Sequence, residues 1–390
     1  MLRILVVEAV TSGLVDKAGS SILSEGFAML SSIIKGLTGL GCEVSTLLAK
    51  KFTALVRYLP PVKLYKLEKP SLAELRRLAK LHDSTYVIAP EDDGLLAELL
   101  EELDGLHMCS KPEAVRSVSD KASLTLRLSK EGFRVPETVV YEPGEPLDVG
   151  CLKPPYVVKP NTGAGCVGLS IARTLEELKK AVSDAGRPVL IQEFIDGVPA
   201  SVSLLTDGSN TIPLSLNRQY LDLCRRIYLG GYTPMYHELI GEAFDTASRV
   251  VSLFNGLRGY IGVDVVLSRD GVYVVEVNPR LTVSYVGLNR VLEPDPAKGI
   301  FEAGLGRLRT VEYMFNALCY FRKALFKGPV RSGLKKLASL NEIVSPPLPV
   351  ERIDEAYGVL AVVSNNFTKA KNAYLKLLNR LSLETGCEVS

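Results

Sequence analysis

Two apolar strands joined by a tight turn, with acidic and amide side chains inside them, constrain this chain more than any other segment. The stretch from Gly259 to Arg280 is predicted to form a hairpin around the turn Arg269-Asp-Gly271. Glu276 and Asn278 are two residues apart, so both side chains project from the same face of the second strand. The hairpin therefore places at least two oxygen-bearing side chains side by side within Val-rich strands.

The turn decides whether Asp264 joins this pair. A three-residue loop with Gly271 in the left-handed conformation would pair Asp264 with Glu276, whereas a two-residue Asp-Gly turn would put them on opposite faces. Two carboxylates and an amide are costly to bury without compensation, and Mg²⁺ prefers such oxygen ligands. We expect a metal site; the alternative is a strand whose exposed polar residues alternate with buried ones.

A glycine-rich loop follows a strand that ends in a lysine. Gly163-Ala-Gly165-Cys-Val-Gly168 matches G-x-G-x-x-G, but the next residues, 169–173, are predicted to form a strand, and Thr174-Leu-Glu-Glu177 is a capping box that starts the helix later. A dinucleotide fold needs these glycines to open a helix. The loop is therefore predicted to be a flap between two strands. With Lys159 beside it, we favour phosphate binding over a purely structural hairpin.

The composition is that of an ordinary globular enzyme, and it argues against several classes of protein. Hydrophobic residues make up 47% and charged residues 23%, and 46 Lys and Arg nearly cancel 44 Asp and Glu, which argues against nucleic-acid binding. The chain lacks an apolar run of about 18 residues, the length of a membrane span. Its N-terminus is predicted to be a strand rather than a signal peptide, so we expect a cytoplasmic protein.

Cysteine and histidine usage limits the kinds of metal site. The seven cysteines form no Cys-x-x-Cys pair, which argues against a zinc ribbon, although Cys166 lies in the glycine loop. The three histidines are far apart in sequence, so any metal is expected to be bound by oxygen. Glutamine occurs only at 192 and 219, a scarcity that is typical of thermophiles.

Alternating strands and helices predict a parallel α/β domain over residues 1–109. Strands are expected at 3–8, 43–48 and 85–89, and helices at 24–40, 72–81 and 90–103. Ligand-binding groups in such domains gather at the carboxyl ends of strands. The acidic side chains expected there, with solvated helix caps as the alternative for the last three, are Glu8, Glu91, Asp92 and Asp93.

The rest of the chain divides into two further parts. Residues 200–300 are predicted to be mostly strands with one helix around 241–255. The family resemblance carried by the motifs below implies that residues 110–300 form the nucleotide-binding domain, with a lid at about 150–190. Residues 301–340 hold eight Lys or Arg against two Glu, with apolar residues at helical spacing. We expect an amphipathic helix there, solvated or facing a partner. A strand is predicted at 357–364 and a helix at 368–381. The same resemblance implies that residues 340–390 form a small α/β appendage with a structural role.

Four segments then point to a family. Lys121, Val157-Val-Lys159-Pro with its glycine loop, Leu190-Ile-Gln-Glu-Phe-Ile195, and Val263-Asp264 with Glu276-Val-Asn278-Pro-Arg280 resemble the ATP-grasp superfamily in order and spacing. The superfamily is α/β, with an N-terminal parallel pre-ATP-grasp domain. Further segments are similar to the archaeal tyramine–glutamate ligase family and its uncharacterised relatives: Ala89-Pro-Glu-Asp-Asp93, Ser201-Val-Ser-Leu-Leu205, Pro213-Leu-Ser-Leu-Asn-Arg-Gln219 and Tyr285-Val-Gly-Leu-Asn-Arg290.

The resemblance implies a role for each matching residue. Lys121 and Lys159, with Gly163 and Gly165, would hold phosphates of ATP, and Arg280 would stabilise charge on the transferring phosphoryl group. The hinge residues contacting adenine would be Gln192, Glu193, Phe194 and Ile195. Asp264, Glu276 and Asn278 would bind two Mg²⁺ ions, for which Mn²⁺ could substitute. These roles agree with the needs of phosphoryl transfer.

The activity implied is that of a ligase that activates a small-molecule carboxylate as an acyl phosphate and joins it to an amine, such as glutamate to tyramine. Two alternatives remain open: a non-catalytic nucleotide-binding scaffold, and a carboxylase-like enzyme that uses bicarbonate. The chain departs from many relatives by having Val198-Pro-Ala200 where a ribose-binding Glu is expected, with Asp196 as a substitute. The oligomeric state, monomer or homodimer, is left open.

Arg218 is a further candidate, for binding the acid substrate. It lies in the segment 214–219, which is predicted to end an apolar strand before Gly230-Gly231, which we expect to be a loop. An arginine fork binds a carboxylate bidentately, which a lysine cannot reproduce. The alternative is an ion pair with Asp222, one helical turn further on.

Overall fold

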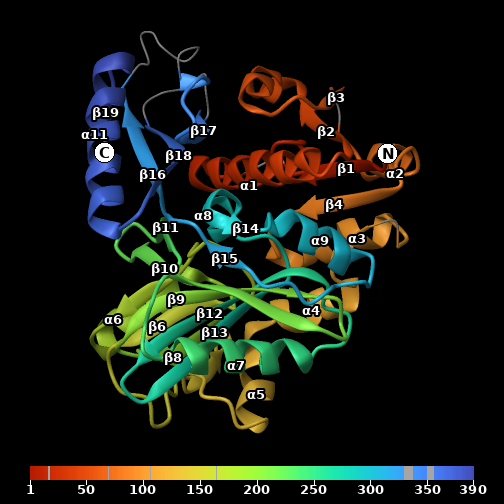
Figure 1. The fold of residues 1–390 in the computed structure, drawn as a ribbon. Helices are drawn as coiled ribbons and strands as arrows, with labels where there is room; N and C mark the ends of the chain where they lie inside the picture. The colour runs from red at the N-terminus through yellow and green to blue at the C-terminus, as the bar shows by residue number, and fades with distance from the viewer. Residues whose placement is uncertain (16–17, 69, 106, 164, 329–336, 349–354) are drawn as a thin grey trace.

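Three larger β-sheets and one two-stranded ribbon organise the described part of the chain (Figure 1). The structure is a computed structural model, and it describes all residues except 16–17, 69, 106, 164, 329–336 and 349–354. None of the described helices combines the length and the apolar character that a bilayer span requires. The mixed α/β fold class expected from the sequence is confirmed.

The N-terminal sheet is parallel, with strand order β3-β2-β1-β4. Its strands are β1 (Arg3–Glu8), β2 (Glu43–Ala49), β3 (Lys63–Leu67) and β4 (Ser84–Ile88), and its helices are α1 (Ser20–Gly39), α2 (Leu72–Ala79) and α3 (Leu95–Glu102), with 3₁₀ turns η1 (Lys50–Tyr58) and η2 (Asp92–Gly94). β1 and β4 are almost entirely buried, as apolar strands covered on both faces should be. The predicted parallel domain is present, with β3 as a strand that the sequence did not predict.

The central sheet is antiparallel and runs in the order β13-β12-β9-β10-β11-β16-β18-β17, with β19 paired to β16. Its strands are β9 (Val198–Thr206), β10 (Thr211–Asp222), β11 (Ile227–Thr233), β12 (Gly259–Ser268), β13 (Gly271–Asn278), β16 (Leu318–Lys327), β17 (Ile343–Leu348), β18 (Glu355–Ser364) and β19 (Glu388–Val389). The sheet therefore joins strands of the expected nucleotide-binding part to strands of the expected appendage.

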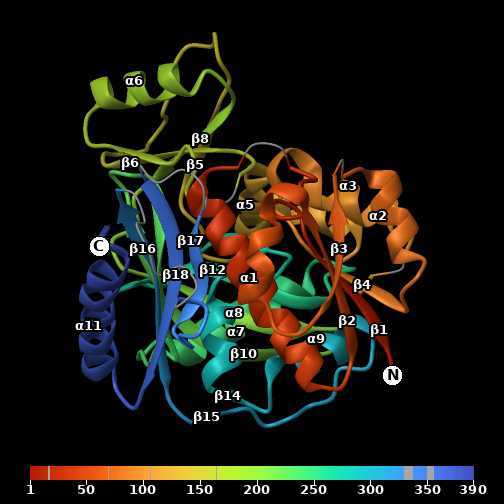
Figure 2. The ribbon, with the colours of Figure 1, turned by 90° about the horizontal axis from the view of Figure 1, so that it is seen from above.

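Helices cover this sheet on both faces (Figure 2). The bounds of these helices are α4 (Pro112–Ser119), α5 (Lys121–Lys130), α7 (Ile240–Ser252), α8 (Ser284–Val291), α9 (Pro296–Gly304) and α11 (Phe367–Thr385), and β14 (Leu292–Glu293) pairs with β15 (Met314–Phe315). Apolar side chains of α4, α5 and α7 form one core with β9 and β12. α8 and α9 are helices that the sequence did not predict.

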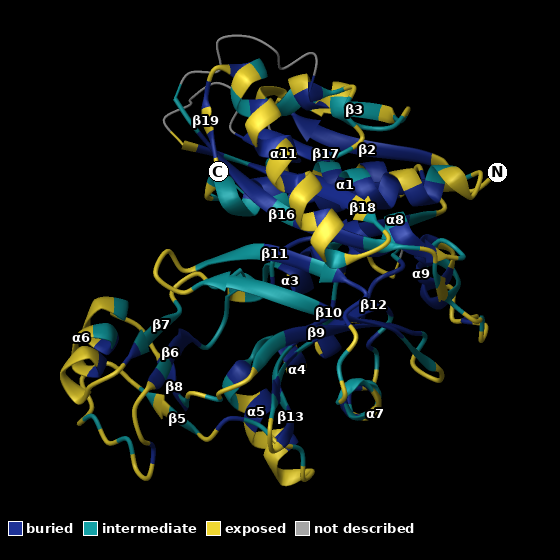
Figure 3. Cartoon of the chain, turned by 60° about the vertical axis from the view of Figure 1, so that its left-hand side comes forward, coloured by how far each residue is buried: buried dark blue, intermediate teal, exposed yellow. Residues whose placement is uncertain are grey.

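The third sheet, with strand order β5-β8-β6-β7, stands apart from the body and carries α6 on its outer side (Figures 2 and 3). Its elements are β5 (Thr138–Tyr141), β6 (Tyr156–Pro160), β7 (Ser170–Ala172), α6 (Leu175–Ala185) and β8 (Val189–Glu193). The Thr174 hydroxyl accepts a hydrogen bond from the Glu177 amide at 3.1 Å, so the predicted helix start is correct. This sheet extends from Thr138 to Glu193 and contains most of residues 150–190, for which a lid was predicted.

The predicted helix over 301–340 is wrong for the part of that segment between Leu305 and Gly328, whereas residues 329–336 lie outside the described residues. α9 ends at Gly304, and β16 occupies the centre of the segment. The run Cys-Tyr-Phe at 319–321 is buried because α8 and α11 pack against this strand, and pairing with β11 and β18 determines its conformation. Of the basic residues counted there, Arg331, Lys335 and Lys336 lie outside the described residues.

Deletion of residues 341–390 is expected to destroy the cooperative thermal unfolding transition. The deletion removes β17, β18 and α11, and it exposes buried apolar residues of β16 such as Phe326. The loss should exceed about 5 kcal/mol, a large part of a domain's stability. Calorimetry would check this, with deletion of 388–390 as the milder control. An unchanged melting temperature together with a changed amine preference would contradict the expectation.

Candidate active site

A cavity of about 300 Å³ lies where the central sheet, the lid and the N-terminal part meet. Its walls include Lys121, Lys159, Asp264, Glu276, Asn278 and Arg280, together with the glycine loop and residues 192–195. These positions are spread over about 160 residues of the chain. The fold thus brings the predicted nucleotide- and metal-site residues to one cavity, whereas Arg218, predicted to bind the acid substrate, is not among its described lining residues.

The β12–β13 hairpin reaches the pairing of Asp264 with Glu276 by an unexpected route. The turn has two residues, because Ser268 pairs with Gly271. That register alone would place Asp264 opposite Val275. A β-bulge between Asp264 and Val265 inserts one extra residue, so Asp264 faces Glu276 instead. The expected pairing is present, but the three-residue turn proposed for it is wrong.

Asp264, which faces Glu276 across the hairpin, is in an environment that disfavours its charged form. Burial, and then the nearby Glu276 carboxylate, raise the pKa of Asp264 to about 7. Hydrogen bonds from Gln219 and Asn278 oppose that rise, and the Gln219 amide nitrogen lies 2.9 Å from the Asp264 carboxylate. Within the described residues, no group of three or more His, Cys, Asp or Glu side chains could hold a metal ion. Any cation here would therefore share its ligands between this hairpin and a bound phosphate.

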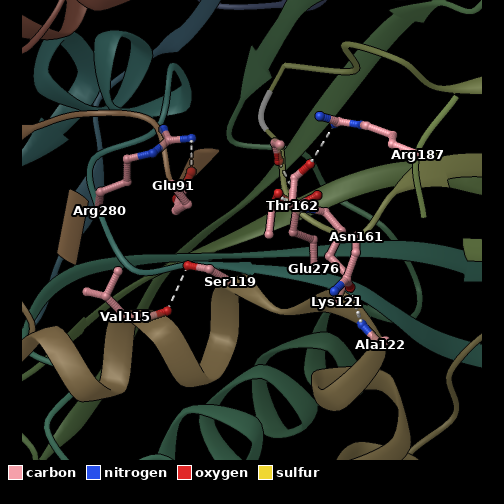
Figure 4. Close-up of polar contacts among 11 residues, drawn as sticks. Glu91, Val115, Ser119, Lys121, Ala122, Asn161, Thr162, Arg187, Glu276 and Arg280 are labelled. Carbon is pink, nitrogen blue, oxygen red and sulfur yellow. Dashed lines mark hydrogen bonds and ion pairs between the residues drawn. The ribbon is translucent and has the colours of Figure 1, made fainter. Parts of the chain in front are cut away.

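Lys121 is positioned by the start of α5. The Asp120 carboxylate caps that helix by accepting a hydrogen bond from the Ser123 amide at 2.8 Å. The buried Lys121 ammonium donates to the Gly163 carbonyl at 2.8 Å and lies 3.2 Å from the Glu276 carboxylate (Figure 4). A lysine is thus held between the glycine loop and the hairpin.

The glycine loop joins two strands, as predicted, and its backbone requires glycine. Gly163, Gly165 and Gly168 all have positive φ, and a Cβ at Gly168 would lie 2.7 Å from the Pro160 ring. Cys166 also has positive φ, and burial raises the pKa of its thiol to about 12, which leaves it protonated at neutral pH. The loop forms one wall of the cavity beside Lys159.

Lys159, at the end of β6, is buried among charges. Burial and the Lys121 ammonium lower the pKa of Lys159 to about 8, and the Glu276 and Asp264 carboxylates oppose that change. Its ammonium is therefore present below pH 8 and is lost as the pH rises through that value. A phosphate bound beside it would receive a charge-assisted contact in the lower pH range.

Substitution of Lys159 by Ala is expected to weaken ATP binding at pH 7 by at least about 10-fold, since the charge-assisted contact is lost. Calorimetric titration of ATP into the nucleotide-free protein would measure this. Wild-type affinity should also decline above pH 8, and Lys159→Arg should remove that decline because an arginine stays charged. Equal ATP affinity in wild type and Lys159→Ala would remove this side chain from the site.

Arg280 follows β13 and pairs with Glu91. Its guanidinium donates to the Glu91 carboxylate at 2.8 Å, and both side chains are nearly buried (Figure 4). Burial raises the pKa of Glu91, and Arg280 opposes that shift. One oxygen each of Glu91 and Asp92, and the Arg280 Nε, are buried without a hydrogen-bond partner. The reading of Glu91 as a solvated helix cap is therefore wrong.

Other acidic residues near the strand ends have structural roles. The Glu8 carboxylate accepts hydrogen bonds from the backbone amides of Val10, at 3.0 Å, and Thr11, at 2.7 Å. Asp93 lies in η2 with positive φ and accepts a bond from Thr162 at 3.4 Å. Neither carboxylate lines the large cavity within the described residues.

The predicted hinge lies at the cavity, with its side chains partly engaged elsewhere. The Gln192 amide donates to the Thr138 hydroxyl at 2.8 Å, and the Glu193 carboxylate accepts from the Glu137 amide at 3.0 Å. Phe194 and Ile195 complete this wall of the cavity. Asp196 is exposed and is not part of the described cavity lining, so the structure does not support it as a substitute for the ribose-binding Glu.

The structure contradicts the hypothesis for Arg218. This residue lies within β10, and its guanidinium donates to the Pro199 and Gln219 carbonyls and stacks on Tyr220. The neighbouring Gln219 contacts Asp264, so Arg218 projects from the other face of the sheet. Gly230-Gly231 belongs to β11 rather than to a loop, and Asp222 pairs with Arg225.

The sequence did not predict that Glu25 and Tyr228 line the cavity. It also did not predict the ion pair between Glu91 and Arg280. Glu25 lies in α1, between the buried residues Ser24 and Gly26. An acidic residue on the buried side of an apolar helix was the available signal. Tyr228 carried no comparable signal, because its position depends on the pairing of β10 with β11.

Comparisons with known proteins agree with this geometry. The chain matches the ATP-grasp domain over residues 118–284 and the pre ATP-grasp 3 domain over 42–115. It is 34% identical over 288 residues to the tyramine–L-glutamate ligase of Methanocaldococcus jannaschii, covering 72% of this chain and 82% of that protein. A D-alanine–D-alanine ligase of Maridesulfovibrio salexigens is 26% identical over 211 residues, covering 49% of this chain and 67% of the relative.

Solved structures show the same fold. An ATP-grasp superfamily protein from Archaeoglobus fulgidus superposes with a TM-score of 0.65 at 25% identity, covering 92% of this chain and 99% of that one. An ADP complex of N5-carboxyaminoimidazole ribonucleotide synthetase superposes with a TM-score of 0.72 at 14% identity, covering 96% of each chain. With the cavity and its residues, these matches lead to one conclusion. The chain belongs to the ATP-grasp family and is an ATP-dependent, ADP-forming carboxylate–amine ligase.

Proposed function

We propose that this ligase phosphorylates a carboxylate of an amino acid, with L-glutamate as the first candidate, and joins the acyl group to an amine such as tyramine. The observation that supports this is the convergence of two lysines, an arginine and the hairpin carboxylates on one cavity. The candidate substrates come from the name of the 34% identical relative. Positioned cations are what phosphoryl transfer requires.

The hairpin fits a divalent cation, for which Mg²⁺ is proposed. Asp264 and Glu276 face each other, both partly buried, and their repulsion contributes to the raised pKa of Asp264. A cation between them would remove that repulsion, and Asn278 adds a third oxygen ligand. When bound, Mg²⁺ or Mn²⁺ would neutralise charge on the β- and γ-phosphates of ATP.

Each cationic side chain has a proposed task. Lys121 and Lys159 bind phosphate oxygens, because both ammonium groups lie next to the glycine loop. Residues 192–195 contact adenine at the lid side of the cavity. Arg280 stands at the junction with the N-terminal part, where it stabilises charge on the transferring phosphoryl group while Glu91 holds its orientation.

The proposed reaction has two steps, phosphorylation of the acid and displacement of phosphate by the amine. A carboxylate oxygen of the acid attacks the γ-phosphorus, forming an acyl–phosphate bond while the bond to ADP breaks. The neutral amine then attacks the acyl carbon, phosphate leaves, and the nitrogen gives up a proton. Because the acyl phosphate is prone to hydrolysis, the glycine loop would exclude water by closing over it.

A substrate assay tests this proposal directly. ADP release would be followed with ATP and Mg²⁺, with L-glutamate and tyramine supplied singly and together. We expect fast ADP release and a glutamyl amide product only when both are present. Omission of Mg²⁺ with a chelator should abolish turnover. ADP release that depends on no acid–amine pair from a panel of amino acids and amines would contradict the proposal.

A further inference from the structure

Glu25 lines the active-site cavity and forms an ion pair with Lys323, which is not itself among the described lining residues of that cavity. Glu25 comes from α1 and Lys323 from the middle of β16, so the pair links the first helix to the C-terminal part of the chain. Their side chains are 12% and 1% exposed, respectively. Two charges from opposite ends of the sequence are thus almost removed from water at the same point.

The surroundings of this pair connect it to the reacting groups. Glu25 lines the large cavity and also a second cavity of about 40 Å³, and Arg280 lines both. The Lys323 ammonium donates to the Ser21 hydroxyl and lies 5.9 Å from the centre of the Tyr228 ring. Tyr228 lines the large cavity as well. The pair therefore stands beside Arg280, on the side of the N-terminal sheet.

Stability alone gives a weak reason for such a pair. Desolvating two charges costs several kcal/mol per ion, and well-packed apolar residues often replace a buried pair without loss. The proposed roles of Lys121, Lys159 and the hairpin in nucleotide binding leave this pair unused. The pair lies next to a cavity. A ligand that carries both a positive and a negative group can therefore separate the two side chains and bind each of them through its opposite charge.

We propose that Glu25 and Lys323 form a two-charge seat for the substrate amino acid. Lys323 binds its free α-carboxylate, and Glu25 binds its α-ammonium, while the second carboxylate reaches the phosphoryl group beside Arg280. This inference rests on the proposed function, because it assumes an amino-acid substrate. In the free enzyme the two side chains neutralise each other, which keeps the seat formed until the ligand arrives.

The seat makes β16 a specificity element. Lys323 lies outside residues 118–284, over which the ATP-grasp domain matches, and inside the segment that the sequence assigned to a basic helix. Its backbone carbonyl accepts a hydrogen bond from the Tyr374 hydroxyl at 3.1 Å, so α11 supports the strand behind it. The C-terminal part therefore acts in substrate choice as well as in stability.

Binding measurements on the full chain test this seat. The protein would be loaded with Mg²⁺ and a non-hydrolysable ATP analogue and titrated with three probes. L-glutamate carries both charges, 4-aminobutyrate lacks the α-carboxylate, and glutarate lacks the ammonium. We expect Lys323→Met to weaken L-glutamate binding at least about 30-fold and to leave 4-aminobutyrate binding unchanged. Glu25→Gln should weaken L-glutamate to the level of glutarate.

Two controls keep the result interpretable. Lys327→Met changes a half-buried lysine at the end of the same strand and should bind all three probes like wild type. The double variant Glu25→Gln with Lys323→Met leaves no unpaired charge, so it should fold and still bind L-glutamate weakly. Unchanged L-glutamate affinity in a folded Lys323 variant would overturn the seat.

The two proposals fail in different ways. If the wild-type chain binds none of the standard L-amino acids, the seat is overturned, regardless of whether the protein releases ADP in the substrate assay. If L-glutamate binds in the expected pattern but no acid–amine pair produces ADP, the proposed function is overturned and the seat is supported. Full ADP release with glutamate in the Lys323→Met variant at wild-type KM would also overturn the seat.

Discussion

Glu276→Gln is expected to reduce turnover by at least about 100-fold, the scale seen when one group that stabilises transition-state charge is removed. The substitution removes a carboxylate that faces Asp264 and lies 3.2 Å from the Lys121 ammonium. It keeps the size and shape of the side chain, so the hairpin should fold. Steady-state ADP release at saturating ATP and Mg²⁺ would measure the loss.

Glu176→Gln is the matched control, because Glu176 is exposed on α6 and is not among the described cavity-lining residues. It should retain wild-type turnover and thermal stability. Metal titrations of the Glu276→Gln variant would then show whether Glu276 is an essential metal ligand or one whose loss a higher metal concentration overcomes. Near-normal activity once Mg²⁺ or Mn²⁺ is saturating would show that this carboxylate is not an essential metal ligand.

Arg280→Lys is expected to lower kcat by about 100-fold with little change in the KM for ATP. A lysine preserves a charge for the buried Glu91, so the protein should stay folded, but it lacks the planar fork that can hold Glu91 and a phosphoryl oxygen together. A loss confined to kcat is the pattern of an interaction made only in the transition state. Single-turnover measurements of ADP formation would place the defect in the phosphoryl-transfer step.

Arg116→Lys provides the control for this substitution. Arg116 pairs with Glu101 in a similar arginine–carboxylate geometry, but both side chains are about half exposed. Surface pairs contribute little, so this variant should match wild type in kcat and melting temperature. An Arg280→Lys variant with wild-type kcat would contradict the role proposed for Arg280.

Local sequence patterns determined much of the fold and most of the proposed nucleotide site. The strand ending in Lys159, the glycine loop without a following helix, and the capped helix at Thr174 are governed by short-range preferences, and the structure has all three. Glu276 and Asn278 share a face because strand periodicity requires it. Where side chains lie a few residues apart on one element, the sequence was sufficient.

Interactions between distant elements decided the rest. The bulge after Asp264, rather than the turn, sets the carboxylate pairing, because an extra residue in one strand shifts the register. β16 became a central strand because β11 and β18 pair with it, overriding its helical spacing. Contacts between sheets and helices also determine the sheet face from which Arg218 projects. The same kind of contact brings Glu25 and Lys323 together as an ion pair. A sequence pattern specifies local conformation, whereas the tertiary structure alone decides which remote charges share one cavity.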